Sequence, residues 1–224
     1  QSQSQSQSEN LKTAVLELEE LRRWEETKEA QYNSCTGHRR FPPACLNLLK
    51  NISGNFFCVD CEASNPQWAT VTYGGLICLQ CSGKHRQLGV QMSVVRSITM
   101  DSWTHKNVLA MLEGGNKQLG DFFSRHGLSS SETHSHSPTI NTSAHTHSSH
   151  DDSNVNAIVD RYQTNAALFY KKNLSDHVDR VEKSGEYKGR DHSRKKNQKN
   201  KNSSNRRGRK QLRAEGGKEV EVKV

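Results

Sequence analysis

Four cysteines in two close pairs constrain this chain more than any other feature. Two residues separate Cys58 from Cys61 and Cys78 from Cys81, and sixteen residues lie between the two pairs. Four thiolates at this spacing can surround one ion tetrahedrally, with zinc–sulfur distances of about 2.3 Å. Because protein then fills all four coordination positions, we predict one structural Zn2+ with no position open for a catalytic water.

The alternative use of a C-x-x-C pair is a thioredoxin-like dithiol. That interpretation fits poorly, because two such pairs are present and neither opens a helix after a βαβ strand. A disulfide framework is disfavoured as well, since the first residues are QSQSQSQS instead of a basic stretch followed by an apolar one. Cys35 and Cys45 lie outside the pattern, and we expect them to be ordinary thiols.

Composition predicts one small core with solvated segments around it. Hydrophobic residues make up 31% of the 224 residues, and the mean hydropathy is -0.92. The apolar runs fall short of the roughly 20 residues that cross a bilayer, so we expect a soluble protein without a transmembrane segment. Of the net charge of +8, residues 188–213 contribute +11 (twelve Lys or Arg, one Asp), which leaves -3 for the remainder.

The order of periodic and low-complexity stretches suggests six segments. These are a disordered Gln/Ser repeat (1–9), an amphipathic helix (10–31), the zinc domain core (43–126), a disordered His/Ser-rich insertion (129–153), closing helices (155–183) and a basic low-complexity tail (188–213). Clustered histidines can bind metal, but their irregular spacing within the insertion favours a solvated linker.

Within the core, β-branched stretches at 68–73 and 94–100 predict strands, with Gly74 and Gly75 forming a turn. Helices are expected after Pro42 and Pro43, and again at 104–113 and 116–127. Lys84, His85 and Arg86 follow the last cysteine, as in DNA-binding fingers, but residues 41–128 contain no sustained basic face.

The whole stretch CVDCEASNPQWATVTYGGLICLQCSGKHRQLGVQMSVVRSITMDSW closely resembles the ArfGAP domain, which activates Arf-family small GTPases. The family pattern C-x2-C-x16-C-x2-C-x4-R is met at every position from Cys58 to Arg86. TYGGLICLQCSGKHR, GGN at 114–116 and RYQTNAALFYKK resemble the Golgi-associated subgroup, which has this domain at its N-terminus. The resemblance implies an α+β fold, in which α-helices flank a small zinc-supported sheet of three strands.

By the same resemblance, Arg86 is an arginine finger inserted in trans into the active site of GTP-bound Arf, so the chain is a GTPase activator and not an enzyme. The resemblance also places Trp68, Leu79, Met100 and Asp101 around the GTPase-facing surface. For Leu79 and Met100 the alternative is ordinary core packing. Asp101 could instead cap the following helix or pair with Arg86, and Arg86 could form only an internal salt bridge. His85 is expected to be structural.

The implied role is regulation of vesicle coats and membrane traffic, in the cytoplasm and peripherally at the Golgi or other endomembranes. Three departures from the subgroup leave targeting open, namely about 40 residues before the domain, the insertion, and a basic tail in place of longer C-terminal regions. The alternative is a catalytically inactive zinc-domain scaffold or a nucleic-acid-binding protein that works through its tail. That tail could also bind an anionic membrane surface.

Overall fold

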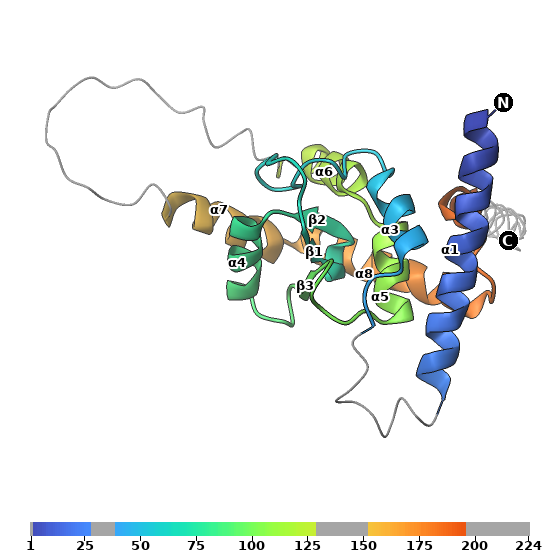
Figure 1. The fold of residues 1–224 in the computed structure, drawn as a ribbon. Helices are drawn as coiled ribbons and strands as arrows, with labels where there is room; N and C mark the ends of the chain where they lie inside the picture. Colours follow the sequence, from blue (N-terminus) through green and yellow to red (C-terminus); the bar gives the residue numbers. More distant parts are fainter. Residues whose placement is uncertain (1, 28–38, 129–151, 196–224) are drawn as a thin grey trace, which may run out of the picture. The chain divides into compact units, whose positions relative to one another are not determined.

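The computed structural model describes residues 2–27, 39–128 and 152–195 (Figure 1). The chain divides into two units, Gln1–Tyr187 and Lys188–Val224. In the second unit, residues 190–195 are helical. The elements of the first unit are α1 (Ser2–Glu26), α3 (Pro43–Lys50), β1 (Trp68–Thr70), a 3-10 turn η1 (Val71–Tyr73), β2 (Gly75–Ile77), α4 (Leu79–Gln87), β3 (Val95–Ser97), α5 (His105–Glu113), α6 (Asn116–Arg125), α7 (Asp152–Gln163) and α8 (Asn165–Lys183).

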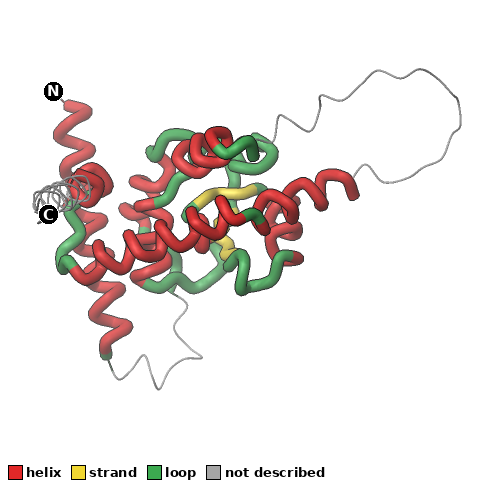
Figure 2. The backbone as a smooth tube through the Cα atoms, turned by 180° about the vertical axis from the view of Figure 1, so that it is seen from behind, coloured by secondary structure: helices red, strands yellow, loops and turns green. Residues whose placement is uncertain are grey.

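A small antiparallel sheet lies at the centre of the first unit. β1 is the middle strand, and its Trp68 pairs with Ile77 of β2 and with Ser97 of β3. Helices surround the sheet, as the view from behind shows (Figure 2). Among them, α8 packs against α5 and η1. The predicted α+β class with three strands and flanking helices is therefore confirmed.

The sheet differs from the sequence prediction in the stretch 68–77. The β-branched run extends only to Thr70 as a strand and then tightens into η1, where Val71 donates its N–H to Val94. Gly75 was predicted to lie in a turn, but it begins β2 and pairs with Thr70. A glycine fits there because a Cβ at Gly75 would lie 3.3 Å from the Asn116 amide oxygen.

Two glycines allow the turn before β2 to touch the end of α5. Gly74 adopts φ +63°, and Gly115 donates its N–H to the Gly74 carbonyl at 2.7 Å. A Cβ at Gly114 would lie only 2.4 Å from the Gly74 oxygen. The backbones therefore meet without any side chain between them.

The N-terminal helix is longer than predicted at its start and shorter at its end. α1 begins at Ser2, inside the repeat for which we predicted disorder, and ends at Glu26. Gln is a good helix former, and adding residues to an existing helix avoids the cost of a new nucleus. Ala14, Leu18 and Leu21 of α1 are buried against the rest of the unit.

Helices α7 and α8 complete the core after the insertion. Ile158, Tyr162, Ala167, Tyr170 and Leu174 are all buried in the same cluster as the strand residues. These helices begin at Asp152, slightly earlier than the predicted residue 155. Residues 129–151 and 196–213, which include most of the predicted insertion and tail, lie outside the described residues, as does Cys35. Within the described ranges, no helix has the length and apolar character needed to cross a membrane.

Candidate metal centre and the arginine beside it

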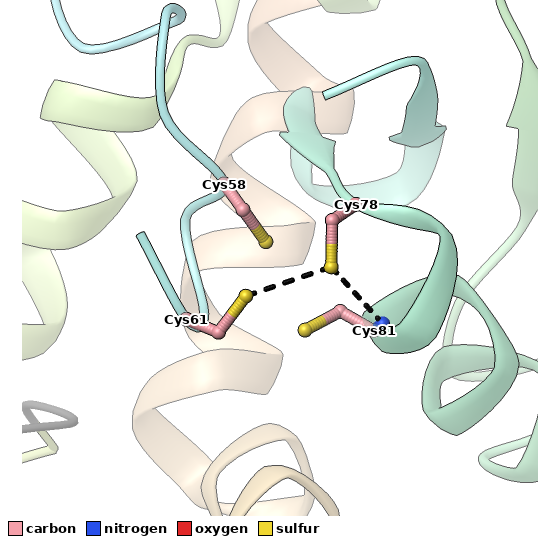
Figure 3. A group of neighbouring side chains, drawn as sticks. All are labelled: Cys58, Cys61, Cys78 and Cys81. Carbon is pink, nitrogen blue, oxygen red and sulfur yellow. Dashed lines mark hydrogen bonds between the residues drawn. The ribbon is translucent and has the colours of Figure 1, made fainter. Parts of the chain in front are cut away.

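The four predicted ligands converge from a loop and from the start of a helix (Figure 3). Cys58 and Cys61 lie in the loop before β1, and Cys78 and Cys81 lie at the start of α4. The four sulfur atoms are all within 4.8 Å of one another, and those of Cys61 and Cys78 are 3.5 Å apart. Four sulfurs around a zinc ion at about 2.3 Å form a tetrahedron with edges of about 3.8 Å, so the donor set fits the ion.

Without an ion, burial and mutual interaction oppose ionisation of all four thiols together. Hydrogen bonding from Cys81 lowers the pKa of Cys58 to about 5, whereas burial raises the pKa of Cys61 to about 11. The bond with Cys58 and burial also raise the pKa of Cys81. Four thiolates at these distances repel one another, so a cation is needed to ionise all four.

Asn116 holds the chain before the first cysteine pair against β2. Its side-chain amide donates to the carbonyls of Phe57, 2.5 Å away, and Leu76, 2.8 Å away, while its oxygen accepts the Leu76 N–H at 2.7 Å. The backbone N–H of Asn116 donates to the buried Asn55 side chain at 2.8 Å. One buried amide thus fixes the chain directly before Cys58 and the strand that leads to Cys78.

A buried polar cluster lies behind the cysteines. The Asp60 carboxylate accepts hydrogen bonds from His85 Nε2 at 2.9 Å, Arg161 at 3.2 Å and the Tyr162 hydroxyl at 2.9 Å. Burial alone would raise the pKa of Asp60, but the adjacent His85 and Arg161 and the hydrogen bonds lower it below its ordinary value. The carboxylate is therefore a charged, fully paired group.

The sequence predicted His85 to be structural, and the structure places it in the interior. Asp60, Arg161 and Tyr162 were missed, because no spacing rule connects positions a hundred residues apart. One signal in the sequence could have found part of this cluster, namely the polar residues Asp60 and His85 beside the predicted zinc ligands. Residues next to metal ligands commonly form hydrogen bonds that orient the metal-binding segment.

Arg86 lies on the solvent side of α4. Its guanidinium carbon is 4.6 Å from the centre of the Trp68 ring, a cation–π contact. Across the described ranges no carboxylate forms an ion pair with Arg86, so the alternative of an internal salt bridge is not what the structure shows.

The sheet register brings three of the predicted interface residues to one end of the sheet. Trp68 begins β1, while Leu79 and Met100 lie two and three residues beyond its partners Ile77 and Ser97. Leu79 is 66% exposed and Met100 65%, so neither is a core residue, and Trp68 is half-buried beneath Arg86.

Asp101 has neither of the two alternative roles considered for it. Its carboxylate accepts the Ser97 N–H at 2.6 Å, which closes the turn after β3. Thr104 caps α5 instead, because its hydroxyl accepts the Asn107 N–H at 3.2 Å. The two alternative predictions for Asp101, a cap of the following helix and a pair with Arg86, were therefore wrong.

Comparison with known proteins agrees with this geometry. The ArfGap family, described as GTPase-activating proteins for Arf, matches residues 44–154. ADP-ribosylation factor GTPase-activating protein GCS1 of Saccharomyces cerevisiae is 49% identical over 83 residues, 37% of this chain and 24% of the relative. ADP-ribosylation factor GTPase-activating protein 3 of Macaca fascicularis is 45% identical over 86 residues, 38% of this chain and 17% of the relative.

Among solved structures, a Cryptosporidium parvum protein described as a GTPase-activating protein for ADP-ribosylation factor aligns with a TM-score of 0.45 and 24% identity, over 60% of this chain and 88% of that one. The chain spans a quarter or less of the length of the two curated relatives. The cysteine spacing, the cluster of four sulfurs and the family match over residues 44–154 agree. Residues 44–154 therefore match the ArfGAP family, both in sequence and in the cysteine cluster that they form.

Proposed function

We propose that this chain is a GTPase-activating protein for an Arf-family small GTPase, and that Arg86 is the catalytic residue it supplies. The observation that carries the proposal is an exposed arginine, five residues beyond the last cysteine of the four-sulfur cluster, that has no ion-pair partner in the described ranges. A guanidinium placed beside the transferred phosphoryl group accelerates GTP hydrolysis by about 10³- to 10⁵-fold.

The surface around Arg86 suits a protein partner. Leu79 and Met100 are exposed apolar side chains at the same end of the sheet as the Arg86–Trp68 pair. Apolar and aromatic side chains around an arginine are typical of the centre of a protein interface. We infer that the GTP-bound Arf contacts this end of the sheet, with Trp68, Leu79 and Met100 surrounding the arginine; Asp101 contributes by holding the turn that carries Met100.

We propose zinc as the ion of Cys58, Cys61, Cys78 and Cys81. When bound, zinc would supply a fixed centre that joins the loop before β1 to the start of α4. The chain's own residues then set the direction of α4, and hence the point from which Arg86 leaves the domain. With an Arf partner, the chain would act in vesicle-mediated transport, in the cytoplasm and at the surface of the Golgi or other endomembranes.

The test is GTP hydrolysis by membrane-bound Arf with and without the purified chain. We expect Arg86→Ala and Arg86→Lys to lower the stimulated kcat by about 10³-fold or more, because lysine lacks the planar guanidinium fork. Zinc stoichiometry and the free energy of unfolding should stay at wild-type values. Arg125→Ala, at an exposed arginine of α6, is the matched control and should stimulate normally. Near-normal stimulation by Arg86→Ala would show that the finger assignment is wrong.

A second candidate function rests on the charge of residues 188–213. Twelve basic side chains against one acidic residue form a strongly cationic segment, which attracts nucleic acid or anionic lipid. In this alternative the zinc domain is an inactive scaffold. Binding of the intact chain to RNA and to anionic vesicles should then fall steeply with salt and disappear when residues 188–224 are deleted. Deletion that leaves such binding unchanged would exclude this function for the tail.

A further inference from the structure

The buried cluster behind the cysteines links the metal loop to the helix that carries Arg86. Asp60 lies between the two ligands of the first pair, and its bond to His85 Nε2 is 2.9 Å long. Both side chains are fully buried. His85 belongs to the last turns of α4 and directly precedes Arg86. The orientation of this part of the helix is therefore tied to the cysteine loop by one charge-assisted hydrogen bond.

The other ring nitrogen of His85 extends the chain of bonds to β1. His85 Nδ1 is 2.8 Å from the Ser93 hydroxyl, which is 2.8 Å from the Thr70 hydroxyl. Thr70 shares the short strand β1 with Trp68, whose ring contacts the Arg86 guanidinium. The network thus reaches Arg86 from two directions, along α4 and through the strand that carries its aromatic contact.

Helix α7 closes this network from the far side. Arg161, 8% exposed, and the Tyr162 hydroxyl both donate to Asp60, and the Tyr162 ring packs edge-on against the His85 ring with centroids 4.5 Å apart. Asp60 therefore has three donors, and His85 has no freedom to rotate without breaking two hydrogen bonds. Groups held in this way keep a neighbouring catalytic group within a fraction of an ångström of its working position.

We propose that His85 is a positioning residue for Arg86, fixed by Asp60 and Ser93 and, through Asp60, by Arg161 and Tyr162. This rests on the proposed function of Arg86. A purely structural role would be limited to folding and metal binding. A positioning role requires in addition that kcat of the stimulated reaction depends on His85, because displacement of a reacting group by about 1 Å can cost about 100-fold.

Two near-isosteric substitutions separate the two bonds of His85. In His85→Asn, the side-chain amide can take the place of Nδ1 and keep the hydrogen bond to Ser93, but it cannot reach Asp60. In His85→Gln, the amide can take the place of Nε2 and keep the hydrogen bond to Asp60. We expect His85→Asn to lower the stimulated kcat about 10- to 100-fold, with KM for GTP-loaded Arf within about twofold of wild type. His85→Gln should lose less, and His126→Asn, at an exposed histidine directly after α6, is the control.

The double variant decides whether His85 acts through Arg86. Adding His85→Asn to Arg86→Ala should lower the residual rate no further, because residues that act as a unit are non-additive. Zinc stoichiometry and urea unfolding, measured on every variant, correct for the folded fraction. The positioning role would be overturned if both His85 variants lost the same amount of stimulated kcat, in proportion to their loss of stability. It would also be overturned if the effects of His85→Asn and Arg86→Ala on kcat were fully additive in the double variant.

Two further measurements keep the test independent of folding and of the Arf activity itself. Tyr162→Phe removes one hydrogen-bond donor to Asp60 but keeps the aromatic ring. If His85→Asn does not fold, the loss of stimulated kcat in Tyr162→Phe tests the positioning role instead. Because the Arg86 guanidinium lies 4.6 Å from the Trp68 ring centre, we expect the ring current to shift the Arg86 Nε–H signal in an NMR spectrum. His85→Asn, or Tyr162→Phe in its place, should move that signal. An unmoved Arg86 signal would contradict the positioning role of His85, whether or not the protein stimulates Arf. Failure of the wild-type protein to stimulate Arf would refute only the proposed function.

Discussion

At the scale of single residues, the four cysteines determine how the metal site responds to pH. The thiols of Cys61 and Cys81 have raised pKa values, so at neutral pH they are protonated until the ion binds. Metal binding must release these protons, and we expect zinc affinity to increase as pH rises from about 6 to about 8, by about tenfold per unit for each proton released. Competition with a chromophoric chelator at three pH values measures this. A pH-independent affinity would mean that the thiols are already ionised.

Asn116 is a residue whose loss should clearly lower stability. Asn116→Ala removes the side-chain partner of the Leu76 N–H and of the Phe57 carbonyl, whereas the Leu76 carbonyl still accepts the Val59 N–H at 3.1 Å. Unsatisfied buried groups cost about 1–3 kcal/mol each, so we expect a decrease of about 2–4 kcal/mol in the free energy of unfolding of the zinc-loaded protein in urea. Asn47→Ala, at an exposed position of α3, should change it by less than about 0.5 kcal/mol.

At the scale of elements, α1 supplies contacts to the starts of two other helices. Pro42 gives α3 no side-chain cap, and the Glu17 carboxylate accepts the N–H groups of Ala44, at 2.8 Å, and Cys45, at 3.1 Å, instead. Glu25 likewise accepts the N–H of His105 at the start of α5, at 2.7 Å. A negative charge at a helix N-terminus is favourable, because it satisfies orphan donors and opposes the helix dipole.

We expect Glu17→Ala to destabilise the protein by about 1–2 kcal/mol, the usual cost of removing a helix cap. Glu17→Gln should cost less, because its amide oxygen still accepts one bond. Thermal unfolding at fixed zinc concentration gives the comparison, with Glu20→Ala on the exposed side of α1 as control. If Glu17→Ala melted with the wild type, α1 would not depend on this contact for docking.

Individual elements show where sequence reasoning succeeds and where it stops. The cysteine spacing predicted all four members of the sulfur cluster, because ligand geometry leaves little choice of residue type and interval. Most helices were predictable from periodicity, but α4 (Leu79–Gln87), which carries Arg86, was not predicted. β2 is three residues long and starts with glycine, so propensity alone indicates a turn there. The bonds from Arg161 and Tyr162 to Asp60 depend on tertiary packing, which no local pattern records.

At the scale of the whole molecule, the core extends beyond the segment that matches the family. The match ends at residue 154, whereas Ile158, Tyr162, Ala167, Tyr170 and Leu174 are buried in the main cluster. Each large buried apolar side chain contributes about 1.5–3 kcal/mol, and a domain is stable by only about 5–15 kcal/mol. A chain that ends at residue 154 should therefore lack a cooperative unfolding transition.

Circular dichroism during urea titration, together with binding of a hydrophobic dye, would show this loss. The matched control is a chain that ends at residue 195 and retains α7 and α8, so it should unfold cooperatively with zinc bound. A cooperative transition in the shorter chain would show that the core residues before α7 are sufficient to fold.

The contact between Gly74 and Gly114 has a consequence for the evolution of this fold. Since a Cβ at Gly114 would lie 2.4 Å from the Gly74 oxygen, and one at Gly74 would lie 2.6 Å from the Ala110 oxygen, neither position can drift to another amino acid while the backbone stays in place. Distant descendants that keep this packing should therefore retain both glycines after most of their surface has diverged. The pair can serve as a marker of common ancestry in sequences too dissimilar for overall identity to be informative.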